Sequence, residues 1–235
     1  MCELDRLILP LPLGSTDPEM LEGEKAVLRQ LKPGTTLHMG DDPSLPSLPE
    51  RPTLIDVYRA RITGLTARHQ LISAKTALDN GLPEKVVMAI LVHDIAIGCL
   101  IRSDHGYWGA QMIAPYVDEE VAFAVQYHQP LRYFADEAAG YAYPDSYNRM
   151  FGPDYQPPAY IRRDADHARS HRWYMSARLV TLYDTYGFDD STAPDPAMFE
   201  DIIGRHFRQP EEGLGFDNSP SAHMWRTVMW PHNAL

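Results

Sequence analysis

The sequence has little of what several classes of protein require. Its 235 residues include only two cysteines, Cys2 and Cys99, too few for the disulfide framework of a small secreted domain. No apolar run approaches the roughly 18 to 20 residues of a membrane-spanning helix, and no GxGxxG or GxxxxGK pattern indicates a phosphate-binding loop. The apolar stretch 7–13 is interrupted by Pro10 and Pro12 and lacks the basic start of a secretory signal. We therefore expect a soluble, cytoplasmic protein without a membrane partner.

Positive charge is also scarce. Lysine and arginine number 21 against 32 aspartate and glutamate residues, which gives a formal net charge of −11 and a pI near 5.3. Binding along a nucleic-acid backbone depends on clustered basic residues, so this balance argues against a nucleic-acid partner. With 44% apolar residues the chain is long enough for one hydrophobic core. We expect a single domain that binds a small molecule.

The distribution of proline divides the chain. Residues 1–50 hold seven prolines, and proline removes a backbone donor and blocks helix continuation. We predict an N-terminal arm over 1–50, with one short helix near 18–31. The main domain is predicted to cover 51–190. Proline, aspartate and glycine return after it, and we predict that 191–235 is a C-terminal extension packed on the domain.

Apolar residues recur at helical spacing after Pro52, which predicts an all-α fold. Asn80-Gly81 is expected to end the first helix and Pro83 to start the next. Residues 136–160, rich in tyrosine, proline, glycine and aspartate, are predicted to form an ordered loop with short helical pieces. The predicted helices cover residues 54–78, 83–100, 104–114, 118–127 and 164–186, with one short helix at 197–208.

A charged pair stands inside the most apolar of these helices. The run 86–100 is nearly continuous in apolar residues, which predicts a helix buried all round, and it carries His93 and Asp94 in its middle. An ionised carboxylate that is buried there costs several kcal/mol unless it is paired or bound to a cation. A bound metal ion would remove that cost.

The residue types restrict which metals are suitable. Imidazole and carboxylate together suit Fe, Mn, Zn or Ni rather than Ca, and carboxylates can bridge two ions inside a helical bundle. A straight helix cannot direct adjacent residues at one ion with the same orientation, so the remaining ligands have to come from other helices. A single histidine is more often a surface or core residue than a metal ligand. Here the apolar surroundings of His93 and Asp94 favour a metal site. We predict six ligands: His69, His93, Asp94, His105, His128 and Asp184.

The order H…HD…H…H…D resembles that of the HD-domain superfamily. The resemblance extends from His69 to Asp184, roughly half of the chain. It implies a helical bundle with a dinuclear metal site between its helices, because one-metal members lack the histidines that correspond to His105 and His128. The segments that carry it are Ala-Arg-His-Gln at 67–70, Val-His-Asp-Ile at 92–95, Asp-His-Gly at 104–106, Gln-Tyr-His-Gln at 126–129 and Leu-Tyr-Asp-Thr at 182–185.

Two classes of enzyme within the superfamily use this ligand set. Two-metal phosphohydrolases often carry a lysine three residues after the aspartate, and here Ile97 stands in its place, so a cation that would stabilise a phosphoryl transition state is missing. The mixed-valent diiron oxygenases, which include myo-inositol oxygenase and phosphonate-cleaving enzymes, form the other class. Similarity to them implies an Fe(II)/Fe(III) pair bridged by Asp94, with Asp94 and His93 at the catalytic centre.

Candidate substrate contacts follow from the same resemblance. Arg132 lies where the phosphonate-cleaving enzymes carry a lysine that meets the substrate, and arginine holds oxyanions well; a solvated loop cation is the equal alternative. Arg178 is proposed separately, because it is close to Asp184 in sequence and could reach the substrate, with a supporting or surface role as the equal alternative. The positions of the substrate-locking glutamate and tyrosine hold Ile62 and Arg59, and we predict that Tyr58, the nearest tyrosine, contacts the substrate instead.

Three functions are consistent with these features of the sequence. The preferred one is a diiron oxygenase that uses O2 to oxidise or cleave a small hydroxylated, anionic, phosphonate-like substrate. The alternative is a two-metal phosphohydrolase, with Mn, Ni or Zn, that acts on a phosphoester or nucleotide. The third is a non-catalytic HD module that senses a ligand. The complete set of metal-ligand residues argues against it, because a catalytically silent domain has no need to bury these charges. The sequence leaves the oligomeric state open, a homodimer included.

Overall fold

The computed structural model describes residues 45–97, 104–188 and 191–231. They belong to one compact unit, Gly40–Ala234. Over these ranges the chain is all-helical, with one isolated bridge between Asp136 and Tyr141 and no strand, which confirms the predicted fold class. None of the described helices combines the length and apolar character needed to cross a membrane. The helix predicted near 18–31 lies outside the described residues.

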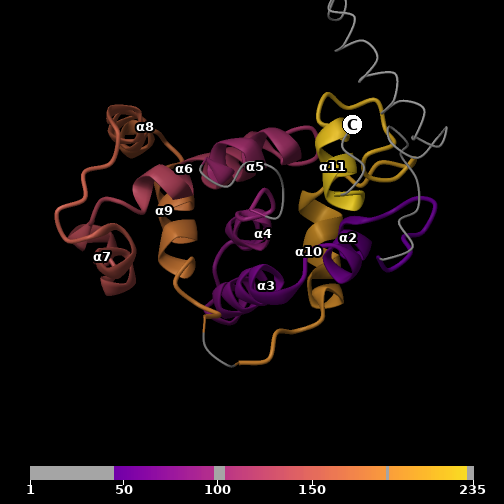
Figure 1. The fold of residues 1–235 in the computed structure, drawn as a ribbon, viewed down its shortest axis with the longest axis horizontal. Coiled ribbons are helices and arrows are strands. Elements are labelled where there is room, and N and C mark those ends of the chain that lie inside the picture. Colours follow the sequence, from indigo (N-terminus) through magenta and orange to yellow (C-terminus); the bar gives the residue numbers. More distant parts are fainter. Residues whose placement is uncertain (1–44, 98–103, 189–190, 232–235) are drawn as a thin grey trace, which may run out of the picture. The chain divides into compact units, whose positions relative to one another are not determined.

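The helices follow one another along the chain, and longer connections precede α5, η3 and α11 (Figure 1). Asn80 caps the end of the helix before Gly81, as predicted. The last helix was not predicted from the sequence. The elements are α2 (Leu54–Ala60), α3 (Gly64–Asp79), α4 (Glu84–Val92), α5 (His105–Ile113), α6 (Glu119–Leu131), η2 (Glu137–Ala139), α7 (Asp145–Phe151), α8 (Ala159–Ser170), α9 (Tyr174–Tyr183), η3 (Pro196–Phe199), α10 (Glu200–His206) and α11 (Ala222–Met229).

Helix α4 is the centre of this unit. Every side chain from Val86 to Val92 is buried, as the all-round apolar pattern predicts. Helices α3, α6, α9 and α10 all pack against it (Figure 1). Because α4 has no solvated face along this stretch, polar residues at its C-terminal end must find their partners on the surrounding helices.

The helix predicted to carry His93 and Asp94 ends directly before them. It ends at Val92, and 93–97 form tight turns, with hydrogen bonds from the Ile95 N–H to the Val92 carbonyl (3.1 Å) and from the Ile97 N–H to the Asp94 carbonyl (2.9 Å). The imidazole of His93 donates back to a carbonyl in the last turn, a bond that helps to end a helix. The turn allows His93 and Asp94 to face the same site.

The first predicted helix is two helices. A break at 61–63 separates α2 from α3. Thr63 precedes α3 in an extended conformation, and Gly64 has a φ of +64°, the left-handed region that favours glycine. The change of direction lets α3 pack along α4 independently of α2.

The predicted helix 164–186 is also two helices. α8 ends at Ser170 and α9 begins at Tyr174, because His171 is extended and its Nδ1 accepts from the Trp173 N–H at 3.2 Å. The His171 ring stacks on Phe123 at a centroid distance of 4.1 Å. This contact with α6 is a tertiary interaction, so helical spacing alone could not predict the break.

Helix α6 is longer than predicted. It continues to Leu131 and contains Pro130, whereas the sequence predicts an end near 127. A proline in the last turn removes a single N–H close to the helix end, where its cost is smaller than in the interior. The Arg132 N–H then closes the helix on the carbonyl of His128 at 3.1 Å. His128 is therefore held in regular helix.

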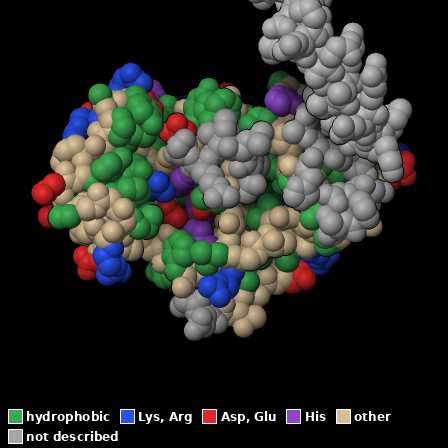
Figure 2. Space-filling model, viewed as in Figure 1, with side chains coloured by type: hydrophobic (Ala, Val, Ile, Leu, Met, Phe, Trp, Pro, Cys, Tyr) green, Lys and Arg blue, Asp and Glu red, His purple; other side chains and the backbone are tan. Residues whose placement is uncertain are grey.

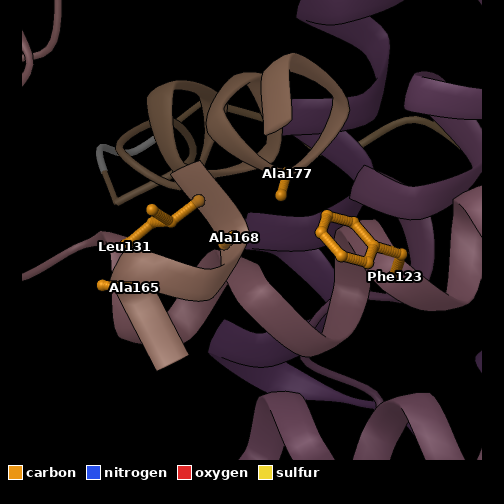
Figure 3. Packing of buried hydrophobic residues seen from close by; sticks show 5 residues of the cluster. All are labelled: Phe123, Leu131, Ala165, Ala168 and Ala177. Atoms are coloured by element: carbon orange, nitrogen blue, oxygen red, sulfur yellow. The ribbon is translucent and has the colours of Figure 1, made fainter. Parts of the chain in front are cut away.

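Small side chains bring α8 and α9 close to α6. Figure 3 shows Ala165 and Ala168 of α8 and Ala177 of α9 beside Phe123 and Leu131 of α6. All five are buried, and alanine leaves little distance between helix backbones. This cluster fixes α9, which ends next to the candidate site, against α6.

Glycine has the same role between α5 and α6. A Cβ atom at Gly106 would lie 2.9 Å from the Gln126 carbonyl oxygen and 3.0 Å from the Gln129 Cβ, while the Gly106 N–H donates to the Gln129 side chain at 2.9 Å. Any larger residue would force the two helices apart. The close contact holds His105, at the start of α5, next to His128.

We expect Gly106→Ala to lower the free energy of unfolding by about 1 to 3 kcal/mol, the usual cost of overpacking. Gly204→Ala is the matched control, because α10 has no atom within 4 Å of an added Cβ there. Alanine at that position should leave stability unchanged or raise it by up to about 1 kcal/mol. Urea unfolding followed by circular dichroism measures both. Equal effects of the two substitutions would contradict the requirement for glycine at 106.

Candidate metal centre

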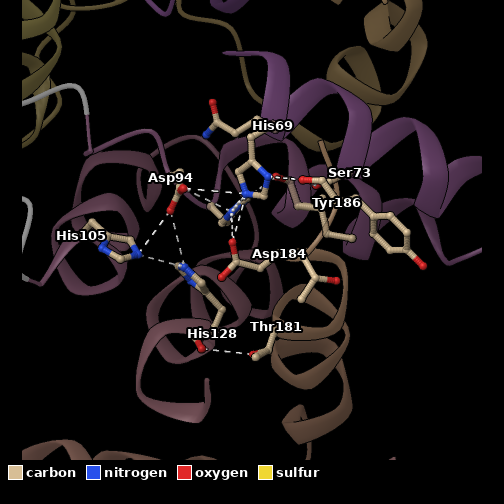
Figure 4. Close-up of polar contacts among 12 residues, drawn as sticks. His69, Ser73, Asp94, His105, His128, Thr181, Asp184 and Tyr186 are labelled. Atoms are coloured by element: carbon tan, nitrogen blue, oxygen red, sulfur yellow. Dashed lines mark hydrogen bonds and ion pairs between the residues drawn. The ribbon is translucent and has the colours of Figure 1, made fainter. Parts of the chain in front are cut away.

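The six predicted ligands meet in one buried cluster (Figure 4). None is more than 8% exposed. His69 lies in α3, His93 and Asp94 directly follow α4, His105 begins α5, His128 lies in α6 and Asp184 directly follows α9. Four imidazoles and two carboxylates from five parts of the chain therefore converge, although they span more than a hundred residues.

Four of these residues form a first group. The Nε2 atom of His69 lies 3.0 Å from Asp184 Oδ1 and 3.1 Å from His93 Nε2. His93 Nε2 is 3.3 Å from the same Asp184 oxygen and 3.5 Å from Asp94 Oδ2. One donor atom from each of the four lies within 4.8 Å of the others. This spacing can accommodate one metal ion.

The second group shares Asp94 with the first. Asp94 Oδ1 lies 3.3 Å from His105 Nε2 and 3.8 Å from His128 Nε2, and these two nitrogens are 3.3 Å apart. In Figure 4 Asp94 stands between His105 on one side and His69 on the other. Its two oxygens thus point to different groups, so the cluster offers donors for a second ion as well.

Hydrogen bonds to the backbone decide which imidazole nitrogens are free to bind a cation. Three Nδ1 atoms face carbonyl oxygens: His69 faces that of Tyr186, His93 that of Ile90, and His128 that of Val125. We assign the ring proton to Nδ1 in each, which leaves the Nε2 lone pairs directed at one another and at the carboxylates. Lone pairs this close repel unless a proton or metal ion lies between them. The donor set therefore fits a metal.

Charge in the cluster shifts the pKa values of its members. Burial pushes the pKa of His93 down, but the adjacent Asp94 and Asp184 carboxylates outweigh burial and raise it to about 9. Burial opposes ionisation of the two carboxyls as well, yet the surrounding imidazoles hold the pKa of Asp94 and of Asp184 below its usual range. A proton on the cluster thus replaces the cation when no metal is bound.

Gln70 and Tyr58 support the turn that carries Asp94. We assign the Gln70 amide the orientation in which its oxygen accepts from the Asp94 and Ile95 N–H groups, both at 3.1 Å. Tyr58 is buried, and its hydroxyl donates to the Leu91 carbonyl. Burial and then the charge of Asp94 raise the Tyr58 pKa. The structure places Tyr58 in the core behind the cluster and not in the substrate contact expected from the sequence.

A cavity of about 390 Å³ opens onto the cluster. On the face in Figure 2, histidine and acidic side chains come to the surface in a hollow between groups of hydrophobic side chains. The volume lies within the range of small-molecule sites. The cavity is lined by Leu65, Thr66, His69, Asp94, Ile97, Arg132, Pro144, Ser146, Tyr147, Met150, Asp184, Thr185 and Phe188.

Arg132 is on the wall of this cavity, where its predicted contact with a substrate requires it. Its Nη2 donates to the Tyr133 hydroxyl at 3.0 Å, and its guanidinium lies over the rings of Tyr133 and Tyr147 at 5.0 and 5.6 Å. No carboxylate of the described residues lies within 4.0 Å of it. A largely buried cation without an ion-pair partner is suited to hold an anion.

Arg178 has a different place. It is fully buried and donates to the carbonyls of Leu131 and Phe134, each at 3.2 Å, and to the Tyr174 hydroxyl at 3.1 Å. These bonds tie the end of α6 to α9, and Arg178 is not among the described residues that line the cavity. The predicted substrate contact by Arg178 is therefore replaced by a structural role.

Several site residues were not predicted from the sequence. The Tyr147 hydroxyl lies 3.5 Å from Asp184 Oδ2, and the Phe188 ring stacks on that of His69 at 4.3 Å. Gly187 directly precedes Phe188 and has a φ of +77°. Glycine is needed at this position because a Cβ atom would lie 2.8 Å from His69 Cα. The tyrosine-rich loop was the one signal for Tyr147, and nothing local in the sequence indicates its contact with α9.

We expect the metal-free protein to lose stability as the pH rises from about 6.5 to 9. Below the unfolded pKa near 6.5 both states hold the His93 proton, and above it only the folded state does until its own pKa of about 9 is reached. The free energy of unfolding should fall by about 1 kcal/mol per pH unit in this window. The lowered pKa values of the Asp94 and Asp184 carboxyls affect stability below this window. Their contribution to stability is lost as the pH falls below about 4.

Calorimetry of the metal-free and the metal-loaded chain from pH 6 to 9 tests this expectation. The loaded chain should show no such fall, because the metal replaces the proton. A metal-free chain whose stability is constant or rises over the window would contradict the electrostatic picture of the cluster.

The division into two groups predicts the number of ions that each variant keeps. Asp94→Ala should lose both ions, Asp184→Ala one and His128→Ala the other, whereas His223→Ala, at an exposed histidine of α11, should keep both. Elemental analysis of each full-length variant gives the metal-to-protein ratio. Retention of two ions by Asp94→Ala would disprove a shared carboxylate.

No protein-family model matches this chain, and no curated protein matches it. Similarity to the HD-domain superfamily therefore stays a prediction from the order of six residues. What is established is an all-helical unit with a buried His/Asp cluster that can hold a metal ion.

Proposed function

We propose that this chain is an HD-domain type, metal-dependent oxygenase that holds two iron ions and uses O2 to oxidise or cleave a small hydroxylated, anionic substrate. The observation that carries the proposal is the pair of ligand groups joined by Asp94. A carboxylate between two sets of imidazoles suits two cations better than one, because each oxygen has its own nitrogen neighbours.

The donor set supports a transition metal. Four imidazoles and two carboxylates suit iron, manganese, nickel or zinc, and lack the oxygen-rich shell that calcium requires. His69, His93 and Asp184 would hold one ion, His105 and His128 the other, and Asp94 both. Iron, when bound, supplies the redox chemistry by which dioxygen attacks a C–H bond.

The protein's own residues bind and orient the substrate. His69, Asp94 and Asp184 line the cavity, so the reacting carbon of a bound substrate would lie beside them. Arg132, on the cavity wall, would hold the anionic group by charge-assisted hydrogen bonds. The Tyr147 hydroxyl lies 3.5 Å from Asp184 Oδ2, and it would turn from this carboxylate to donate its one hydrogen bond to a substrate oxygen.

The wall of the cavity favours oxidation over phosphoester hydrolysis. Ile97 lines the cavity three residues after Asp94, where two-metal phosphohydrolases of the superfamily often carry a lysine. An aliphatic side chain cannot neutralise charge on a transferred phosphoryl group. The hydrolase alternative then relies on Arg132 alone, and a non-catalytic module has no physical need for the costly buried charges.

Anaerobic purification followed by metal analysis and electron paramagnetic resonance of the partly reduced protein tests the proposal. We expect two irons per chain and the coupled signal of an Fe(II)/Fe(III) pair. His128→Ala is expected to keep one iron and lose the coupled signal, whereas His223→Ala should keep it. Manganese, nickel or zinc in the site, together with release of phosphate from generic phosphoesters, would reject the oxygenase in favour of the hydrolase.

A further inference from the structure

The cavity differs in character between its floor and its walls. The floor consists of the ligands His69, Asp94 and Asp184, and Arg132 adds one cation. Around them, most of the wall is apolar. Its members come from the start of α3, the turn after α4, the segment of α7 and the segment after α9: Leu65, Ile97, Pro144, Met150 and Phe188.

Three of these wall residues are also unusually exposed. Leu65 is 55%, Met150 67% and Phe188 58% exposed. Single exposed apolar residues are common, but large ones from three separate elements that meet on one cavity mark a binding site. The wall also carries the hydroxyls of Thr66, Ser146, Tyr147 and Thr185. Of these, Thr185 donates to the Leu182 carbonyl at 2.9 Å and Tyr147 to Asp184 Oδ2 at 3.5 Å.

The wall is built into the fold. Phe188 stacks on His69 with an angle of 23° between the rings, and Gly187 lets the chain pass close over the His69 backbone. On the opposite segment, Tyr147 and Phe151 contact edge to face at 5.9 Å on either side of Met150 in sequence. An apolar surface that is already formed needs little ordering when an apolar ligand binds.

We propose that the substrate of this site is an amphiphilic oxyanion, with an alkyl or aryl group of several carbons joined to the anionic, oxidisable end. The apolar group would lie against Leu65, Met150 and Phe188 while the anionic group pairs with Arg132. The inference rests on the proposed function for the position of the reacting end, and on the composition of the wall for the chemical class. A polyol or small zwitterion would leave hydroxyl or ammonium groups against an apolar wall, which costs hydrogen bonds to water.

Binding of a homologous series of probes tests the inference. We would titrate straight-chain alkylphosphonates, from methyl to octyl, into the full-length protein with its metals bound and without O2, by isothermal titration calorimetry. The dissociation constant should fall about threefold to fourfold for each added methylene, as ~0.8 kcal/mol per buried CH2 requires, until the cavity is full. A dissociation constant that does not change with chain length, or is lowest for the methyl compound, would overturn the inference.

Matched variants locate the apolar group. Leu65→Gln combined with Met150→Gln should weaken octylphosphonate at least tenfold and leave methylphosphonate unchanged. Met175→Gln combined with Met198→Gln is the control, because both methionines are exposed, at 47% and 44%, and neither lines the cavity. All four side chains are exposed, so the variants should fold. Equal binding of octylphosphonate by the two double variants would overturn the placement.

The test separates this inference from the proposed function. No turnover or O2 is needed for the titrations, so a chain-length dependence would persist if the centre held zinc and performed no oxidation. Conversely, a coupled two-iron signal together with chain-length-independent binding would overturn the substrate class and leave the oxygenase standing.

Discussion

The repulsion between unshared electron pairs in one buried cluster is the constraint on which the site depends. Backbone carbonyls accept the Nδ1 protons of three imidazoles, and the opposite nitrogens then face each other and two carboxylates at 3.0 to 3.9 Å. In a region almost without solvent such an arrangement is stable only with positive charge inside it. Protons can supply that charge in the free protein, and metal ions would satisfy the same donors without changing which groups face inward.

The fold holds this arrangement through contacts that are not themselves ligands. The all-apolar α4 ends at Val92, and the turn after it directs His93 and Asp94 into the same space. Gly106 brings α5 against α6, while Gly187 brings the segment after α9 over α3. Each glycine acts at the one place where a Cβ atom would separate two ligand-bearing elements. The cluster is therefore preorganised before any ion binds.

Residue types and their order predicted much of this centre, because a carboxylate in an apolar run has few stable explanations. The all-α class and the meeting of six ligands follow from that reasoning. Interruptions at Gly64 and His171, and the role of Arg178, could not be predicted, since they depend on packing between distant helices. Tyr147 and Phe188 were missed for the same reason. Arg132 lies on the cavity wall, whereas the sequence left a substrate contact and a solvated loop position as equal alternatives, because residue type alone does not reveal whether a cation is solvated.

Anomalous X-ray diffraction from crystals of the metal-loaded full-length protein tests the central claim most directly, because it locates ions independently of any activity. The account predicts two anomalous peaks, one among His69, His93 and Asp184 and one between His105 and His128, with a carboxylate oxygen of Asp94 bound to each. A single peak, or ions that do not share Asp94, would contradict it.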